Sequence, residues 1–304
     1  MTKLLVGLGK TDDGYTQAIE IIDLESAKTC KNLPDFPYAT AGFGGLGFQN
    51  MPMICSKNQE NAECYSLDRN KWTFSSTINK AGSNAAVSLS PYPTKSYKLF
   101  LTGGKWSNTA EVLTEQGWKE LPQSIPVTIS YHCAVLVNST TVMVIGGYQN
   151  HKSSNKTYFF NTENEIWTEG PQIKNERYSH SCGTIRKNSQ SQEFSVIVAG
   201  GAESEDKILS SVEILDPGSN EWRKGPDLPF GIMDAQMVAD QNGGVVLAGG
   251  RKGINHINYE YLDTLYQLPH GGEDTEWFEM EQKLDTGREK HVAFLVPDSL
   301  VDCS

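Results

Sequence analysis

Three histidines recur at matching places along this sequence and are the first candidates for chemistry. His132, His180 and His291 each stand at the start of a short apolar segment. If their imidazoles converge, they could bind a metal ion. No H-x-x-x-H, H-x-x-E-H or C-x-x-C spacing accompanies them, so the sequence contains no local metal signature. The alternative is that a repeated unit reuses one polar residue at the same position.

The familiar catalytic motifs are also missing from the sequence. It contains no G-x-S-x-G elbow, no phosphate-binding Walker loop, and no G-x-G-x-x-G between a strand and a helix. The glycines of AGFGGLGF (41–48) lie among strand-like segments and cannot present a helix N-terminus to a phosphate. We therefore expect no catalytic residue and no cofactor. The alternative is a metal-dependent enzyme or a carbohydrate-binding protein with a site at the three histidines.

The elements that must position these residues are marked by pairs of glycines. Four Gly-Gly doublets each close a short run rich in Leu, Val, Ile or Phe, and such runs read as buried strands. A glycine pair lets the backbone take positive φ and lets neighbouring segments approach closely. The runs are KLFLTGG (98–104), VMVIGG (142–147), FSVIVAGG (194–201) and GVVLAGG (244–250). Their regular recurrence is an internal repeat.

Tryptophan recurs with the same period. Five tryptophans follow one another at intervals of 46 to 55 residues, each after a polar turn: Trp72, Trp118, Trp167, Trp222 and Trp277. A third strand-like run lies between doublet and tryptophan, and a fourth precedes the next doublet. Four short strands in about 50 residues are typical of a propeller blade, where an aromatic side chain packs between adjacent sheets.

These doublets and tryptophans resemble the kelch repeat over the whole chain. The resemblance implies an all-β fold, a kelch β-propeller. Two further blades lack the doublet, at 39–77, where Ser56 and Lys57 replace it, and at the start of the chain, where Gly7-Leu8-Gly9 replaces it. The first blade lacks an innermost strand, and residues 291–297 can supply one. We predict six blades in a single domain, 1–304, closed by pairing of the C-terminal strand with the first blade, which removes exposed sheet edges.

Composition limits the class of partner. The formal net charge is −11 and the sequence pI is near 5.1, which argues against nucleic acid or an anionic membrane as the main partner. No apolar run approaches the roughly 18 residues that a membrane-spanning helix needs. The hydrophobic share of 38% is that of a folded chain.

The predicted function is binding of a partner protein or peptide through loops at one end of the propeller, where rigid scaffolds present binding residues. In kelch substrate adaptors, the resemblance implies, the loops after the doublets and before the innermost strands surround the peptide-binding pocket. Arg, Tyr and Trp dominate interface energetics. The candidate binding residues are Trp106, Tyr131, Tyr148, Arg177, Tyr178, Arg251, Arg288 and Lys290.

The basic members of this set predict a locally positive mouth on an acidic molecule, suited to an acidic peptide or a carboxylate ligand. The alternative is that each arginine pairs with a neighbouring carboxylate. Kelch adaptors carry a BTB domain before the propeller, and the sequence leaves no room for one, which favours a free-standing role. Actin binding, known for some kelch proteins, is a further candidate that no residue selects.

Six cysteines bear on the compartment. They are either buried free thiols or three disulfides, Cys55–Cys64, Cys30–Cys303 and Cys133–Cys182, and disulfides would imply an oxidising compartment. The segments TCKNLPDFP, ICSKN…ECYSLD and VPDSLVDCS are also similar to a group of secreted invertebrate kelch proteins. Sequons at Asn138 and Asn155 fall in predicted loops. We expect an extracellular protein. The alternative is a cytoplasmic one, because residues 1–20 contain no signal peptide.

Overall fold

Antiparallel sheets make up almost all of the regular structure in the computed structural model. The structure describes residues 3–26, 30, 33–48, 51–57, 62–78, 85–88, 99–104, 107–114 and 116–301. Within these ranges the one helical element is a single 3₁₀ turn, η1 (Asp298–Leu300). The predicted all-β class is confirmed.

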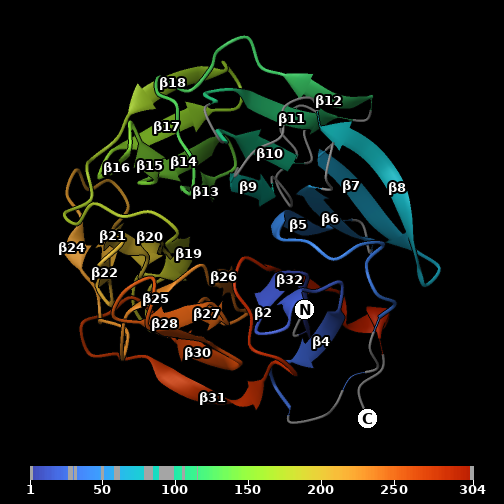
Figure 1. Ribbon diagram of the computed structural model, residues 1–304. Coiled ribbons are helices and arrows are strands. Elements are labelled where there is room, and N and C mark those ends of the chain that lie inside the picture. The colour runs from blue at the N-terminus through green and yellow to red at the C-terminus, as the bar shows by residue number, and fades with distance from the viewer. Residues whose placement is uncertain are drawn as a thin grey trace.

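Five sheets have four strands, and each follows the order in which its strands occur along the chain. They are β5 (Gly42–Phe48), β6 (Met51–Lys57), β7 (Ala62–Asp68) and β8 (Lys71–Ile78); β9 (Ala85–Ser88), β10 (Leu99–Thr102), β11 (Ala110–Thr114) and β12 (Gly117–Glu120); β13 (Cys133–Asn138), β14 (Thr141–Ile145), β17 (Thr157–Asn161) and β18 (Ile166–Glu169); β19 (Ser181–Arg186), β20 (Phe194–Ala199), β23 (Val212–Leu215) and β24 (Arg223–Lys224); β26 (Gln236–Ala239), β27 (Val245–Ala248), β30 (Thr264–Leu268) and β31 (Phe278–Lys283). Figure 1 shows these sheets arranged around a common centre, with the first strand of each sheet innermost.

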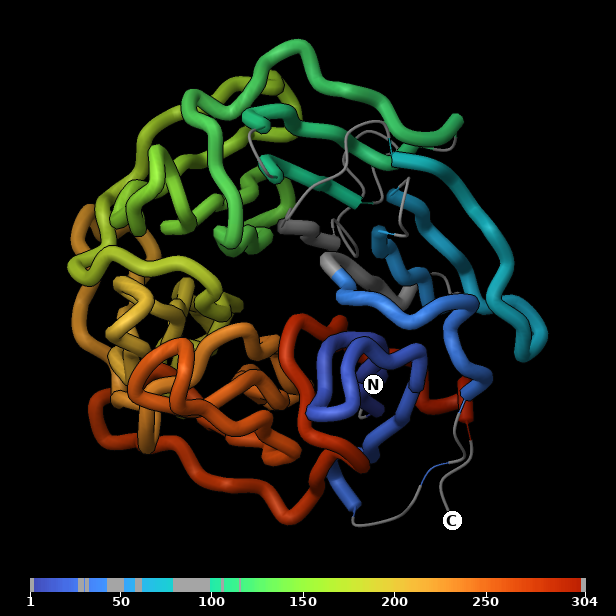
Figure 2. The backbone as a smooth tube through the Cα atoms, in the orientation of Figure 1, coloured from blue at the N-terminus to red at the C-terminus, as the bar shows by residue number. Residues whose placement is uncertain are grey.

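A further sheet combines the two ends of the chain. Its order is β32 (Val292–Val296), β1 (Lys3–Gly7) and β4 (Ile19–Asp23). β32 runs antiparallel to β1, with Lys3 opposite Val296 and Gly7 opposite Val292. Figure 2 shows the C-terminal red segment beside the N-terminal blue one. The pairing that the sequence predicted between residues 291–297 and the start of the chain is present in this register.

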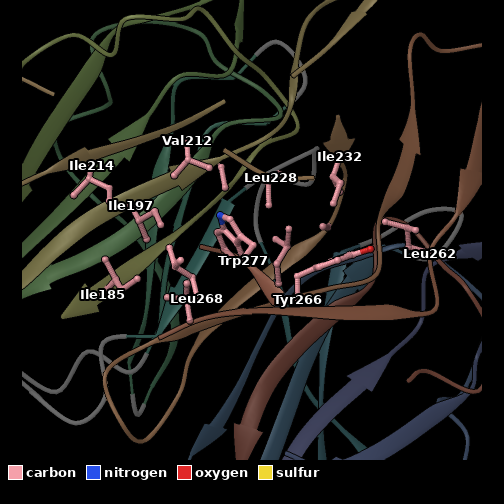
Figure 3. Packing of buried hydrophobic residues seen from close by; sticks show 14 residues of the cluster. Ile185, Ile197, Val212, Ile214, Leu228, Ile232, Leu262, Tyr266, Leu268 and Trp277 are labelled. Atoms are coloured by element: carbon pink, nitrogen blue, oxygen red, sulfur yellow. The ribbon is translucent and has the colours of Figure 1, made fainter. Parts of the chain in front are cut away.

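The recurrent tryptophans lie where neighbouring sheets meet. Trp277 packs with Ile197 and Val212 of the preceding sheet and with Tyr266 and Leu268 of its own (Figure 3). Each indole N–H also reaches back to the preceding repeat. The distances are 2.8 Å from Trp72 Nε1 to the carbonyl oxygen of Pro34, 2.8 Å from Trp222 to Pro171, and 2.9 Å from Trp277 to Pro226. The recurrence of tryptophan therefore has the packing cause that the sequence suggested.

The doublets allow the same close approach. Both glycines of each doublet have positive φ. At Gly147, where φ is 94°, an added Cβ would lie 2.7 Å from the Cβ of His132. Leu8 and Gly9 take the same positive φ in the first repeat, at 64° and 102°. Glycine at the second position of each pair thus allows the inner ends of two repeats to touch.

Candidate interaction surface

One end of the molecule is built from short hairpins that follow the doublets directly. They are β2 (Lys10–Thr11) with β3 (Gly14–Tyr15), β15 (Tyr148–Gln149) with β16 (Lys152–Ser153), β21 (Ala202–Ser204) with β22 (Lys207–Ile208), and β28 (Arg251–Gly253) with β29 (Tyr259–Tyr261), which β25 (Ile232–Met233) extends to three strands. We call this end the hairpin face. Figure 1 shows its strands distributed around the ring.

A series of backbone hydrogen bonds connects successive repeats on the hairpin face. Ser179 N donates to the carbonyl oxygen of Tyr131 (2.8 Å), Asp234 N to that of Ser179 (2.9 Å), Lys290 N to that of Asp234 (3.0 Å), and Gly42 N to that of Lys290 (3.1 Å). The four acceptors Tyr131, Ser179, Asp234 and Lys290 all have positive φ although none is glycine. The series fixes the backbone of these loops, and with it the directions of the side chains they present.

Arg177 and Arg288 lie inside the molecule and do not line the face. Their exposed fractions are 0% and 2%. Arg177 Nη2 lies 2.8 Å from Glu213 Oε1, and Arg288 Nη2 lies 2.6 Å from Glu20 Oε1. Guanidinium groups enclosed in this way cannot reach a partner. The structure therefore corrects the predicted positive mouth at these two residues in favour of the carboxylate-pairing alternative.

Arg251 is also engaged by carboxylates. Its Nε lies 3.0 Å from Glu289 Oε2, its Nη2 lies 3.5 Å from Asp234 Oδ2, and its guanidinium carbon lies 4.7 Å from the ring centre of Tyr259. Burial and the nearby Asp234 raise the pKa of Glu289. Two carboxylates against one arginine leave this cluster without a positive excess, so it does not favour an acidic ligand.

Lys290 is the basic candidate that remains partly exposed, with 37% of its side chain accessible. Burial lowers the pKa of its ammonium group, but Asp234 and Glu289 outweigh burial, so the pKa is raised and the group stays charged. Lys290 therefore brings a single charge to the hairpin face, balanced by adjacent carboxylates.

The three predicted tyrosines lie near one another at this face as a strip, in which Tyr178 is buried, with 9% of its surface exposed. Tyr131 is 43% exposed, and its neighbour Ser130 pairs with Tyr148 through a backbone bridge. The rings of Tyr148 and Tyr178 meet edge to face at 5.3 Å. The hydroxyl of Tyr178 lies 3.2 Å from His256 Nε2. Burial, with help from Glu205, raises the pKa of Tyr178 to about 12. Burial, with help from Arg251, lowers the pKa of His256, so at neutral pH a neutral hydroxyl lies beside a neutral imidazole.

The strip ends at two isoleucines that the sequence reasoning missed. Ile254 is 73% exposed and Ile257 is 84% exposed, at the tip between β28 and β29. The tip is ordered, because Asn255 Oδ1 accepts hydrogen bonds from the backbone N–H groups of Ile257 (3.0 Å) and Asn258 (2.8 Å), and His256 N donates to Glu205 O at 3.0 Å. The sequence signal that could have indicated this exposed tip was the presence of two isoleucines in an Asn-rich turn after a doublet.

Trp106 and Cys303 lie outside the described residues. Of the predicted disulfides, Cys55–Cys64 and Cys133–Cys182 are present. Cys30 is disulfide-bonded as well. Cys55 and Cys64 face one another across β6 and β7, whereas Cys133–Cys182 connects the innermost strands of two neighbouring sheets.

The three histidines lie in separate joints between repeats. His132 contacts Gly103 and Gly147, His180 contacts Gly146 and Gly201, and His291 contacts Gly249 and Gly9. Burial lowers the pKa of both His132 and His291 to about 3, and lowers that of His180 well below 6.5. Across the described part of the chain, no group of three or more His, Cys, Asp or Glu side chains could hold a metal ion. Each of the three imidazoles packs against the glycines of its own joint.

Comparison with known proteins identifies the repeat. The sequence profile of the Kelch motif matches residues 130–173, which contain the β13–β18 sheet, and residues 195–229, which contain β23, β24 and all but the first residue of β20. The chain contains kelch repeats in these two segments. It is 30% identical over 142 residues to Kelch repeat and BTB domain-containing protein 2 of cowpox virus strain GRI-90, covering 46% of this chain and 23% of that protein.

Other relatives extend the match along the chain. Kelch repeat and BTB domain-containing protein 12 of Danio rerio is 26% identical over 227 residues, covering 67% of this chain and 34% of that protein. The kelch chain thus spans about a third or less of the length of these relatives. The solved structure of YjhT superimposes with a TM-score of 0.68 over 91% of this chain and 97% of YjhT, at 11% identity. This likeness concerns the fold alone. None of the helices in the described ranges is long and apolar enough to cross a membrane.

Proposed function

We propose that this kelch-repeat chain is a protein-interaction module that binds a partner protein or peptide through the hairpin face. The observation that carries the proposal is the tip formed by Ile254 and Ile257, which are 73% and 84% exposed on an ordered hairpin. Exposed apolar side chains on a hydrogen-bonded backbone gain from desolvation on binding, and the backbone loses little entropy. Tyr131, the exposed member of the tyrosine strip at 43%, supplies a residue type that is enriched at the centre of interfaces.

The partner chemistry follows from what the face offers. Arg177 and Arg288 are enclosed and Arg251 is paired with Asp234 and Glu289, so the reason for preferring an acidic partner is lost. The tip adjoins Glu205, whose carbonyl accepts from His256. A partner with an apolar pocket for the isoleucines fits this face better than an acidic peptide does. No observation favours actin.

We further infer that the sheets are six blades of one closed ring, forming a single domain over 1–304. Two observations support this. β32 pairs with β1 along the full length of both strands. Lys290 directly precedes β32, so the backbone series connects the β32–β1–β4 sheet to the β26–β31 sheet through Asp234 and to the β5–β8 sheet through Gly42. An extracellular location is supported by the Cys55–Cys64 and Cys133–Cys182 disulfides.

Random peptides displayed on phage provide the test, with the immobilised chain as target. Peptides selected on the wild-type chain should bind the Ile254→Asp/Ile257→Asp variant at least 10-fold more weakly, because one central apolar contact is worth about 2 kcal/mol. Phe194→Asp is the matched control: Phe194 is 46% exposed but begins β20 at the opposite end of its sheet. Equal loss in both variants, or none in either, would contradict the proposed face.

A further inference from the structure

The sequence contains two Asn-x-Thr sequons that partner binding does not explain, and the fold places them at opposite ends. Asn138 ends β13 and lies opposite Thr141, the first residue of β14. β14 ends at Ile145, four residues or about 14 Å along the strand from Thr141, and the doublet follows Ile145 directly. Asn155 follows β16 and belongs to the hairpin face. The two sequons therefore differ in surroundings as well as in sequence.

The hydrogen bonds that hold the side chain of Asn138 use its Oδ1 and do not involve its Nδ2. Asn138 is exposed, in a two-residue turn formed by Ser139 and Thr140. Its Oδ1 accepts hydrogen bonds from Thr140 N at 2.9 Å and from Thr140 Oγ1 at 3.2 Å. A backbone N–H can only donate, so the accepting atom is Oδ1, and Nδ2 takes no part in these bonds. Nδ2 is the atom that an N-linked glycan would join.

The second sequon is embedded. Thr157 is 2% exposed, and its Oγ1 donates to the carbonyl oxygen of Pro171 at 3.0 Å. Asn155 is half-buried, and its own carbonyl accepts from Ile173 N at 3.0 Å. A bulky glycan at Asn155 would lie against the hairpin face, whereas one at Asn138 would extend from the opposite end into solvent.

The disulfides supply an independent observation about compartment. Cys55–Cys64 lies within one sheet, and Cys133–Cys182 joins β13, the strand that ends at Asn138, to β19. Such bonds form and persist in oxidising compartments. In eukaryotic cells the same compartment carries out glycan transfer to Asn-x-Ser/Thr, so the two features belong to one cellular route.

We propose that Asn138 is an N-glycosylation site. The donor is a lipid-pyrophosphate-linked oligosaccharide. A bond forms between Asn138 Nδ2 and the anomeric carbon of the first sugar, while the bond from that carbon to the pyrophosphate oxygen breaks. The lipid pyrophosphate leaves with the electron pair, and Nδ2 loses one proton to a base of the transferase. Transfer precedes completion of folding, and the turn then keeps the modified side chain in solvent, away from the hairpin face.

Glycopeptide mapping of the full chain, secreted from eukaryotic cells, tests the site. We expect the peptide containing Asn138 to carry a glycan that a peptide-N-glycosidase removes, converting Asn138 to Asp. In an Asn155→Gln background, which removes the second acceptor, the enzyme should still shift the mass of the intact protein. Adding Asn138→Gln or Thr140→Ala should abolish that shift.

Two matched variants separate the sequon from the turn. Thr140→Ser keeps the hydroxyl and should retain the glycan. Thr141→Ala removes the adjacent hydroxyl, which is not part of the sequon, and should retain it too. Mapping on the wild-type chain needs no variant to fold. Secreted, disulfide-bonded protein with an unmodified Asn138, or a mass shift that survives Thr140→Ala, would overturn the proposal. Neither outcome bears on peptide binding at Ile254 and Ile257.

Discussion

Two neighbouring sheets fill the same interior position in different ways. The position is identified by the backbone: Arg177 O accepts from Gly147 N at 2.8 Å, and Ile129 O accepts from Gly104 N at 2.8 Å. In the β19–β24 sheet the position holds Arg177 with Glu213. In the β13–β18 sheet it holds Ile129, in one apolar cluster with Tyr158. Glu213 stands opposite Val198, and Tyr158 stands opposite Val144, at matching places before the doublets.

The charged arrangement satisfies most of its hydrogen-bonding groups, although Arg177 Nε is buried without a partner. The guanidinium of Arg177 donates to the carbonyl oxygens of Gly200 (2.8 Å) and Ser211 (2.9 Å) as well as to Glu213. The carboxylate of Glu213 also accepts from the backbone N–H groups of Lys174 (2.6 Å) and Asn175 (3.0 Å). A buried ion pair is tolerable when its remaining donors and acceptors are used in this way.

The apolar arrangement removes a donor instead. Residue 126, which stands where Lys174 stands in the next repeat, is proline and has no N–H to satisfy. The pattern recurs further along the chain. The β26–β31 sheet has the apolar arrangement, because Ile232 and Tyr266 share a cluster and residue 229 is proline. The β32–β1–β4 sheet has the charged one, because Arg288 pairs with Glu20 and Asp285 N donates to Glu20 at 2.7 Å. Three residues therefore change together, which shows that the repeats alternate between two self-consistent interiors.

Removing the arginine alone should have the largest effect on stability. Arg177→Met leaves Glu213 buried without a counter-charge, and we expect the free energy of unfolding to fall by about 3–5 kcal/mol in denaturant titrations. Arg223→Met is the control in the same sheet. Arg223 pairs with Asp216 at 2.8 Å but is 29% exposed, so its loss should cost about 1 kcal/mol or less. Similar losses in the two variants would show that burial does not set the cost.

The histidine joints should make stability depend on pH. The pKa of His132 and of His291 falls from 6.5 in the unfolded chain to about 3 in the folded one, because burial disfavours the charged ring. The unfolded state therefore binds more protons below pH 6.5, and stability falls as pH falls. Linkage gives a loss of about 2 kcal/mol per histidine between pH 7 and pH 5.

A fourth joint, which lacks histidine, provides the natural control for this dependence. An added Cβ at Gly250 would meet the Cβ of Ala235, just as an added Cβ at Gly147 would meet the Cβ of His132. Ala235 therefore occupies the position that histidine holds in the other joints. His132→Ala should lower stability at pH 7 but flatten its decline toward pH 5, as followed by thermal midpoints across that range. An unchanged slope would mean that His132 is not a source of the pH dependence.

The same comparison explains what the sequence could and could not predict. Periodicity of Gly-Gly and Trp predicted the sheets, because most contacts between repeats use these two residue types. The roles of Arg177 and Arg288 were misjudged, because a single arginine in a loop reads as exposed. The pairing with Glu213 and Glu20 would have emerged from aligning third strands across repeats and noting proline at 126 and 229. Ile254 and Ile257 were missed, since exposure of a turn residue depends on the turn's contacts.

Converting the charged interior into the apolar one should change the free energy of unfolding least, and it tests most directly whether the three residues depend on one another. Arg177→Ile/Glu213→Tyr removes both charges but leaves the N–H groups of Lys174 and Asn175 without their acceptor. Adding Lys174→Pro removes one of these donors and should recover about 1 kcal/mol.

In the wild-type chain the same Lys174→Pro change breaks the 2.6 Å bond to Glu213 and should be destabilising. The sign of a single substitution should therefore reverse between the two backgrounds, as a double-mutant cycle measures. If Lys174→Pro destabilised both backgrounds equally, the covariation of proline with tyrosine would have no energetic basis, and the two interiors would differ only in charge.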